Sequence, residues 1–498
     1  MFHIRTVKTA SSAIAVQVVR YAHRKMIIAV HLGSAHNPEE LLALKRSAAD
    51  WIETASQQQP LFPTAPAATT RLISLNKCRY LGIRYHFIRE VMYQLFRRFQ
   101  FHAVGNTLLT DLVLMRIVEP ASKLRSLELL EQFFGISYPR KDFYRSLPLV
   151  VAWRTAAEAG VLALARKEYH FDFAVVFYDV TTLYFEVCRE DTLRQPGFSK
   201  DGKPHQPQIL IGLIVTSEGF PVAYEIFKGN TFEGHTLLPS ISALQRKYHI
   251  RRLTVVADAA MITRDNIREL VISNFTYIVG ARTGNLSHTL LQKVCRGLRQ
   301  RDGATLRLTT AYGGLVCDFS LTRYRKDKRE LEQQLKKAET LLQHPGAIKR
   351  VKFIKSTGRA RYELNAPLLE KTKHLLGIKG YYTNLPATID NQMILQQYRN
   401  LWRVEQAFRI AKSDLQFRPI YHFKKASIEA HILICFMALA VCKYMEMKTG
   451  TSTKQMVQLL KGVTDARILN TLTHEEIIMR SEIPDEVKLL LAKLNLSY

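Results

Sequence analysis

The stretch VVFYDVTTLYFE, residues 175–186, has the β-branched and aromatic composition of a buried strand, yet Asp179 stands in its middle. A carboxylate inside such a strand is costly unless something pairs with it. Two further apolar runs, QILIGLIVTS (208–217) and FPVAYEIFKGN (220–230), follow and are joined by a turn at Glu218-Gly219. Three consecutive strands of this kind predict an antiparallel meander.

Helix and strand patterns alternate after the meander. HTLLPSISALQRKY (235–248) has helical spacing, RLTVVADAA (252–260) is a short buried strand, TRDNIRELVIS (263–273) is helical again and FTYIVGAR (275–282) is a strand. This alternation predicts parallel strands joined by crossover helices. A meander followed by such crossovers is the ribonuclease H-like order, although other mixed sheets produce similar patterns. We therefore expect an α/β fold with a ribonuclease H-like mixed-sheet core.

The remaining chain divides by composition. Helical spacing dominates 85–165, where a basic DNA-binding surface and an ordinary helical bundle are equally good interpretations. The expected organisation is an N-terminal hairpin, helix and linker (1–70), a helical DNA-binding region (71–168), the first part of the core (169–281), a β-rich insertion (282–388), the second part of the core with a glutamate-bearing helix (389–448) and a C-terminal helical tail (449–498).

Charge gives the first indication of a partner. The chain holds 71 Lys and Arg against 43 Asp and Glu, a formal charge of +28. Such an excess of positive charge indicates a polyanionic partner, and nucleic acid is favoured over an anionic membrane surface. A generally basic soluble protein is the alternative. Six cysteines without a CxxC pair suit a reducing compartment. The longest apolar run, ILICFMALAV (432–441), is too short to span a membrane, so we expect a cytoplasmic protein.

Asp179 has a counterpart in Asp258, which ends the strand-like run LTVVAD. Functional groups collect where strands of α/β sheets end, and paired carboxylates are ligands for Mg²⁺ or Mn²⁺. Either aspartate alone could instead cap a helix or pair with an arginine. A third acid, Glu405, lies in YRNLWRVEQAFRIAK (398–412), with Tyr398 seven residues before it and Lys412 seven after. Because seven residues are nearly two helical turns, Tyr398, Glu405 and Lys412 are expected on one face of a helix. This face is either part of a functional site or simply exposed to solvent.

A basic segment precedes this helix. KRVKFIKSTGRAR (349–361) contains no acid, and its Lys349, Arg350, Lys352, Lys355, Arg359 and Arg361 are expected to contact phosphates. A solvated hairpin is the alternative.

The stretch 398–412 resembles the Y-x₂-R-x₃-E-x₆-K signature of IS4-type DDE transposases. Leu401 occupies the arginine position, so Arg399 and Arg403 are the candidate replacements. Other stretches resemble the IS1634 group of these insertion-sequence transposases: HLGSAHNPEEL, RIVEPASKLRS, FYDVTTLYFE, FKGNTFEGHTL and RPIYHFKKASIEAHILICFMAL. The resemblance implies a ribonuclease H-like core with Asp179, Asp258 and Glu405 as the catalytic triad, and phosphate contacts from Tyr398 and Lys412.

The chemistry expected of such a site is metal-dependent in-line attack on a phosphodiester. Three carboxylates can hold two Mg²⁺ or Mn²⁺ ions, with water and then a DNA 3′-hydroxyl as nucleophile. The implied partners are terminal inverted repeats, target DNA and a second copy in a synaptic homodimer, in the nucleoid of a bacterium or archaeon. Glu186 and Glu233 are reserve metal ligands, and His422 and His431 are expected to be structural. Trp402 is expected to pack in the core, with stacking on a displaced base as the alternative. A ribonuclease H-like nuclease and a domesticated DNA-binding protein, both without strand transfer, are the rival interpretations.

Overall fold

The computed structural model describes residues 2–9, 12–22, 25–56, 75–186, 189–200, 202–203, 205–261, 263–343, 352–358 and 361–497. The chain forms two compact units. One contains Met1–Val91, Leu129–Ile136 and Val457–Tyr498, and the other contains Met92–Glu128 and Ser137–Met456. The three carboxylates singled out above all belong to the second unit.

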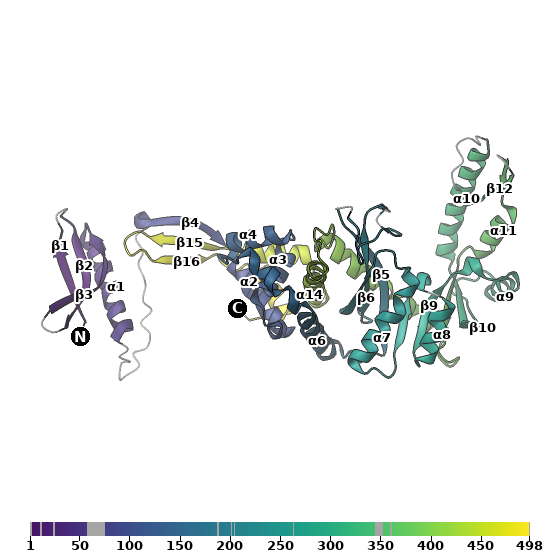
Figure 1. The fold of residues 1–498 in the computed structure, drawn as a ribbon, viewed down its shortest axis with the longest axis horizontal. Helices are drawn as coiled ribbons and strands as arrows, with labels where there is room; N and C mark the ends of the chain where they lie inside the picture. Colours follow the sequence, from purple (N-terminus) through teal and green to yellow (C-terminus); the bar gives the residue numbers. More distant parts are fainter. Residues whose placement is uncertain are drawn as a thin grey trace. The chain divides into compact units, whose positions relative to one another are not determined.

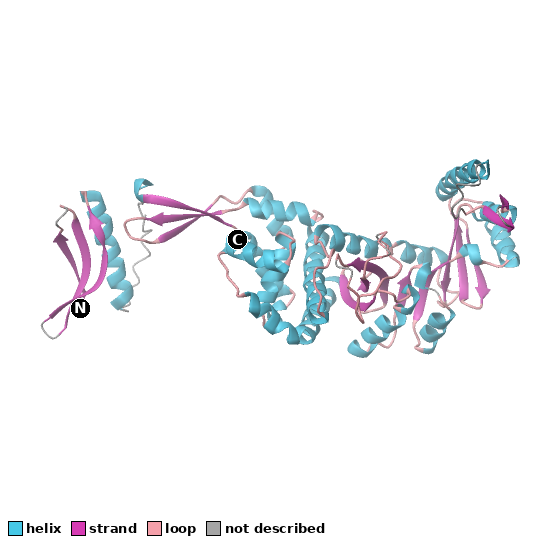
Figure 2. Cartoon of the chain, turned by 45° about the horizontal axis from the view of Figure 1, so that its top comes forward, coloured by secondary structure: helices cyan, strands magenta, loops and turns pink. Residues whose placement is uncertain are grey.

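The first unit begins with an antiparallel sheet of β1 (Phe2–Lys8), β2 (Ile14–Ala22) and β3 (Lys25–Ala35), with α1 (Pro38–Ser56) beside it (Figures 1 and 2). The sequence predicted only the hairpin of the last two strands. Asn37 caps α1 through its side chain, which accepts from the Glu40 amide at 2.8 Å, while the Glu40 carboxylate accepts from the His36 amide at 2.7 Å. This reciprocal arrangement satisfies amides that the first helical turn leaves unpaired.

A second small sheet joins distant parts of the sequence. Its strand order is β16 (Glu476–Arg480), β15 (Asp465–Asn470) and β4 (Cys78–Arg84), all antiparallel. The expected C-terminal helical tail is therefore wrong in this respect, because the tail contains a hairpin between α15 (Thr453–Gly462) and α16 (Asp485–Lys493). Arg480 ties the sheet to α2 (His86–Arg98), since it pairs with buried Asp465 at 2.7 Å and with Glu90 at 2.8 Å.

The second unit is built on an eight-stranded mixed sheet of order β10-β11-β14-β9-β8-β5-β6-β7. The antiparallel meander consists of β5 (Val175–Tyr184), β6 (Gln208–Val215) and β7 (Pro221–Lys228). Strand β8 (Thr254–Ala257) runs parallel to β5, and β9 (Thr276–Ala281) runs parallel to β8, with α7 (Leu237–Tyr248) and α8 (Arg264–Ile272) as crossovers. The predicted meander and crossover order is confirmed, and it is consistent with a ribonuclease H-like fold.

The segment 282–388 departs from the expected separate insertion. Its strands β10 (Thr305–Thr310), β11 (Gly313–Phe319) and β14 (Ile378–Thr383) extend the main sheet, with β14 antiparallel to β9. It also carries three helices, α9 (His288–Leu298), α10 (Leu321–Gln343) and α11 (Ala366–Leu375). The charged run DKRELEQQLKKAETLL predicts the second of these, and the other two were not predicted. Among the strands described in this segment, β12 (Ile354–Gly358) and β13 (Arg361–Leu364) form a separate two-stranded sheet.

The chain leaves the main sheet after β11 and returns at β14, although these strands are neighbours. We call residues 321–376 the excursion. Its neck is closed by the Ser320 amide, which donates to the Gly377 carbonyl at 2.9 Å, and by the Gly377 amide, which donates to Asp327 at 3.0 Å. Leu331, Ala338, Phe353, Leu369 and Leu376 form a core within it. The excursion therefore has packing of its own.

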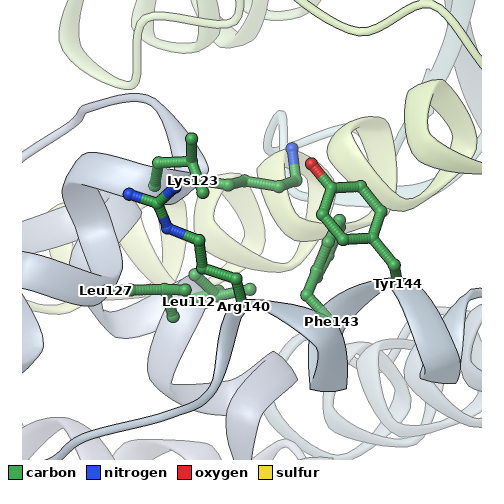
Figure 3. A pocket seen from close by; sticks show the side chains of 7 residues that line it. Leu112, Lys123, Leu127, Arg140, Phe143 and Tyr144 are labelled. Carbon is green, nitrogen blue, oxygen red and sulfur yellow. The ribbon is translucent and has the colours of Figure 1, made fainter.

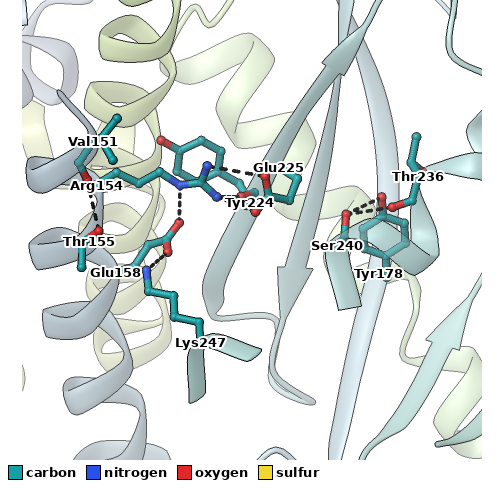
Figure 4. A network of polar contacts seen from close by, with 10 residues as sticks. All are labelled: Val151, Arg154, Thr155, Glu158, Tyr178, Tyr224, Glu225, Thr236, Ser240 and Lys247. Atoms are coloured by element: carbon teal, nitrogen blue, oxygen red, sulfur yellow. Dashed lines mark hydrogen bonds and ion pairs between the residues drawn. The ribbon is translucent and has the colours of Figure 1, made fainter. Parts of the chain in front are cut away.

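Helix α14 (Lys425–Thr449) contacts helices α3 (Thr107–Val118) and α6 (Val150–Tyr169) and strand β7, and it is buried along most of its length. Figure 1 labels the three helices. Figure 4 shows how α6 is attached to the sheet: Arg154 pairs with Glu158 and Glu225, both at 2.8 Å, and lies over the Tyr224 ring. Lys247 of α7 also pairs with Glu158. The network connects one helix to a strand and a second helix.

By length and composition, two helical stretches among the described residues could cross a membrane, Arg140–Tyr169 and Lys425–Thr449. The sequence predicted no segment of that length. The second stretch is mostly buried inside the unit, as the core helix of a globular fold is, and such helices are weak evidence for a membrane protein.

Candidate active site

Asp179 occupies the middle of β5, where its neighbours are Leu213 on β6 and the end of β8. Its Oδ1 accepts a hydrogen bond from the Val180 amide at 2.7 Å. Burial raises the pKa of this carboxyl to about 6, and the charges of Asp258 and Glu405 add to the effect, while Lys200 and the Val180 amide oppose it. The charges of Asp258 and Glu405 therefore both reach the Asp179 carboxyl.

Asp258 follows β8 directly. Because β5 and β8 are parallel with Tyr178 opposite Ala257, Asp179 and Asp258 occupy the next positions on adjacent strands. Asp258 is exposed, and its Oδ1 accepts from the Tyr398 hydroxyl at 3.2 Å. Burial and the Asp258 carboxylate both raise the pKa of Tyr398, which keeps this hydroxyl a donor.

Glu405 lies on a helix that is shorter than the sequence predicted. The expected single helix is divided into α12 (Asn391–Arg399), α13 (Trp402–Arg409) and a π-helical turn, η8 (Ile410–Asp414). Tyr398 and Glu405 therefore lie on different helices, and Lys412 sits half-buried in the π turn. Helix α13 nevertheless packs against β5 and β6, and this packing places Glu405 at the meander.

Carboxylate oxygens suit Mg²⁺ or Mn²⁺, and the charges of Asp258 and Glu405 both reach the Asp179 carboxyl. The three acids therefore fit such an ion by their chemistry. Within the described part of the chain, no three His, Cys, Asp or Glu side chains are already gathered closely enough to coordinate one.

The residues around the missing signature arginine differ in exposure. Leu401 is buried, with 5% of its surface exposed, whereas Trp402 is 52% exposed, so the expectation that Trp402 packs in the core is wrong. Arg399 is largely exposed and lies 3.9 Å from Asp318, while half-buried Arg403 lies beside the Trp402 ring.

The expected phosphate-contacting segment is only partly described. Lys349, Arg350 and Arg359 lie outside the described residues, as does the side chain of Arg361. Lys352 is exposed, and Lys355 pairs with Glu363 at 2.7 Å across the β12-β13 sheet. This sheet is distinct from the one that carries Asp179 and Asp258.

Two lysines near the acids were not predicted. Lys200 donates to the Val180 carbonyl at 2.7 Å and pairs with the reserve ligand Glu233 at 3.0 Å. Lys379 stands on β14, where its charge interacts with those of Asp258 and Glu405. For Lys379 the signal in the sequence was a lone charge in an apolar strand, the same signal that identified Asp179, whereas Lys200 lies between β5 and β6 and had no such signal. The other reserve ligand, Glu186, lies 3.7 Å from Lys203.

The two histidines after Glu405 belong to a buried cluster. Lys123 of α4 (Lys123–Phe134) lies 2.5 Å from His422 Nε2 and 3.2 Å from His431 Nδ1. Burial lowers the pKa of Lys123 to about 7 and that of His422 to about 3. Figure 3 shows Lys123 beside a small pocket, which is lined by Leu112, Lys123, Leu124, Leu127, Arg140, Phe143 and Tyr144. The pocket contains none of the three carboxylates.

Residues 175–441 match the family described as the transposase DDE domain. The match spans more than half of the 498 residues and includes Asp179, Asp258 and Glu405, so the chain belongs to this transposase family. No curated protein matches the chain.

Two solved structures share limited similarity with the chain. A piggyBac transposase synaptic complex with hairpin DNA has 10% identity and a TM-score of 0.39, over 73% of this chain and 70% of that one. The Mos1 mariner paired end complex with Mn has 13% identity and a TM-score of 0.13, over 45% and 65%. Both TM-scores are too low to support any inference about this chain.

Proposed function

We propose that this chain is a DDE transposase of an IS4-type insertion sequence, of the IS1634 group, that cleaves DNA at terminal inverted repeats and joins the ends to target DNA. One observation supports the proposal: Asp179 and Asp258 each follow one member of the Tyr178–Ala257 pair that joins the parallel strands β5 and β8, and the charge of Glu405 acts on the Asp179 carboxyl. Structural carboxylates are normally paired with cations instead of being concentrated in this way.

In this proposal Asp179, Asp258 and Glu405 hold Mg²⁺ or Mn²⁺, two ions together. Bound ions would make water or a 3′-hydroxyl a better nucleophile and would stabilise the leaving oxygen. The chain's own residues then orient the reactants: Tyr398 fixes the Asp258 carboxylate through its hydrogen bond, and Lys412 and exposed Arg399 offer charge to DNA phosphates.

The rest of the chain supports the assembly in the same proposal. The helical region 71–168 binds the inverted repeats, the basic segment 349–361 contacts phosphates, and two copies bring the two ends together. The net charge of +28 supports DNA as the partner. Such a protein would act at the nucleoid in the cytoplasm of a bacterium or archaeon.

The experiment uses the full chain and a supercoiled plasmid that carries the DNA flanking the gene on both sides. We expect cleavage at the element ends with Mg²⁺ or Mn²⁺ and, on addition of a second plasmid, joined products. Asp179→Asn, Asp258→Asn and Glu405→Gln should each reduce cleavage at least about 10³-fold, while Asp265→Asn, an exposed acid on α8, should not.

Cleavage without joined products would favour the nuclease interpretation, and binding without cleavage would favour a domesticated DNA-binding protein. Full metal-dependent cleavage by all three site variants would contradict the assignment of the site.

A further inference from the structure

Strand β14 presents Lys379 and Tyr381 on one face, because alternate residues of a strand point the same way. Helix α12 lies across this face through Tyr398, whose ring centroid is 4.5 Å from that of Tyr381. The Lys379 ammonium stands 5.0 Å from the centre of the Tyr398 ring and 5.9 Å from that of Tyr381. Two aromatic faces therefore hold this cation in place.

Tyr398 connects this lysine to the site, since its hydroxyl donates to Asp258. The Tyr398 side chain thus contacts the Lys379 ammonium through its ring and the Asp258 carboxylate through its hydroxyl. Burial and the nearby Arg323 lower the pKa of Lys379, and the charges of Asp258, Asp318 and Glu405 oppose that effect. Lys379 is nevertheless exposed, and within the described part of the chain it forms no ion pair.

The signature arginine is the cation that this site lacks. Leu401 replaces it and is buried, so no charge can be presented from that position. Of the two arginines nearby in sequence, Arg399 lies near Asp318 and Arg403 lies beside Trp402. Lys379 is a cation from another part of the chain whose charge acts on both Asp258 and Glu405.

We propose that Lys379 binds a phosphate of the DNA end beside the bond that is cut, and so supplies the cation missing at position 401. The proposal rests on the proposed function, because it places the DNA end at the three carboxylates. A lysine ammonium is a compact point charge suited to a phosphate oxygen. Held against two tyrosine rings, it has less freedom to lose when DNA binds.

The first test measures binding and does not depend on cleavage. The probe is a fluorescent duplex of the DNA flanking the gene, titrated with full chain over a range of salt concentrations without divalent ions. Each lost phosphate contact lowers the slope of log affinity against log salt by about 0.9. We expect this loss for Lys379→Gln, little change for Lys379→Arg, and none for Lys326→Gln, a lysine of α10 that is 75% exposed and pairs with Glu330.

The second test measures single-turnover cleavage of the same flanking DNA in a plasmid. Lys379→Gln should cut about 10²-fold more slowly, Lys379→Arg should recover most of the rate, and Lys326→Gln should match the wild type. If Lys379→Gln were slow because it folds poorly, its melting temperature would also fall. Lys379→Glu is a second variant at this exposed position, and it should also cut more slowly at an unchanged melting temperature.

The outcomes separate the two proposals. A wild type that binds the duplex but never cuts would refute the proposed function, while the salt slope would still decide whether Lys379 contacts a phosphate. An active wild type with an unchanged slope and rate in Lys379→Gln would refute the role of Lys379 and leave the proposed function standing.

Discussion

The hydroxyl of Tyr398 donates to Asp258 at 3.2 Å, and 140 residues of sequence separate the two. The contact exists because Gly280, on the strand beside Asp258, has no side chain. A Cβ at this glycine would stand 2.5 Å from the Tyr398 hydroxyl and 3.0 Å from the Ala259 amide nitrogen. A side chain at Gly280 would therefore collide with the Tyr398 hydroxyl that donates to Asp258.

We expect Gly280→Ala to displace Tyr398 and to slow DNA cleavage by about 10-fold or more, because the Asp258 carboxylate loses its donor. Removing the clashing hydroxyl with Tyr398→Phe should recover melting temperature in the double variant, but not the rate. Gly284→Ala is the matched control, since nothing lies within 4 Å of a Cβ there. An unchanged rate in Gly280→Ala would show that the hydrogen bond has no role in the reaction.

Asp179→Asn should stabilise the metal-free protein near pH 8, by up to about 3 kcal/mol at 1.4 kcal/mol per pKa unit. Burial raises the pKa of Asp179 to about 6 from an ordinary 3.8, so the folded state loses stability as pH rises through that interval. Chemical denaturation at pH 4 and pH 8 measures the difference.

Mn²⁺ should raise the melting temperature of the wild type and of Asp265→Asn, and it should leave the melting temperature of Asp179→Asn unchanged. An equal response from all three proteins would argue against a metal at Asp179.

The sequence was most informative where local pattern decides structure. The alternation around 175–282 predicted the meander and the crossovers, and an acid in an apolar strand identified Asp179. Pairing between distant segments left no such pattern: nothing in β4 signals that it joins β15, and nothing in β14 signals that it extends the main sheet. The break at Leu401 was missed because helical spacing continues through it, although the chain there changes from one helix to another.

Leu401→Arg restores the residue of the family signature, and we expect it to harm the protein. Leu401 is only 5% exposed, so the new guanidinium would be buried without a designed partner, at about 3 kcal/mol or more of unfolding free energy. Thermal unfolding would measure the loss, with Leu401→Met as the volume-matched control. A stable Leu401→Arg protein that cuts faster than the wild type would mean that the helix can turn this position toward DNA.

Acid should destabilise the second unit through the Lys123 cluster. His422 has a pKa of about 3 in the fold and 6.5 when unfolded, so unfolding takes up a proton throughout this interval and stability falls as pH drops through it. Burial also lowers the pKa of His431, and the other charged or titratable groups beside His431 are Lys123, Arg116 and Cys435. His422→Gln should flatten the pH dependence by up to about 1.4 kcal/mol per pH unit, whereas His374→Gln, an exposed histidine of α11, should not. Parallel curves for the wild type and His422→Gln would contradict this account.

Arg154→Met should destabilise the second unit by about 2–3 kcal/mol, because it leaves Glu158 and Glu225 without their shared partner in a mostly buried network. Arg246→Met removes the same charge from an exposed position on α7 and should change stability little. Urea denaturation of the two variants compares them directly. Equal midpoints would show that Lys247 alone suffices to hold Glu158.

The neck of the excursion allows an evolutionary reading of this fold. Ser320 and Gly377 are hydrogen-bonded where the chain departs from the sheet and returns to it, and Lys371 of α11 makes a further attachment through the Leu286 carbonyl at 2.9 Å. Strands β11 and β14 pair directly from Gly314–Thr383 to Phe319–Ile378, and residues 321–376 take no part in this ladder. During evolution, residues 321–376 could therefore be lengthened, shortened or exchanged while Lys379, two positions after Gly377, kept its place in β14.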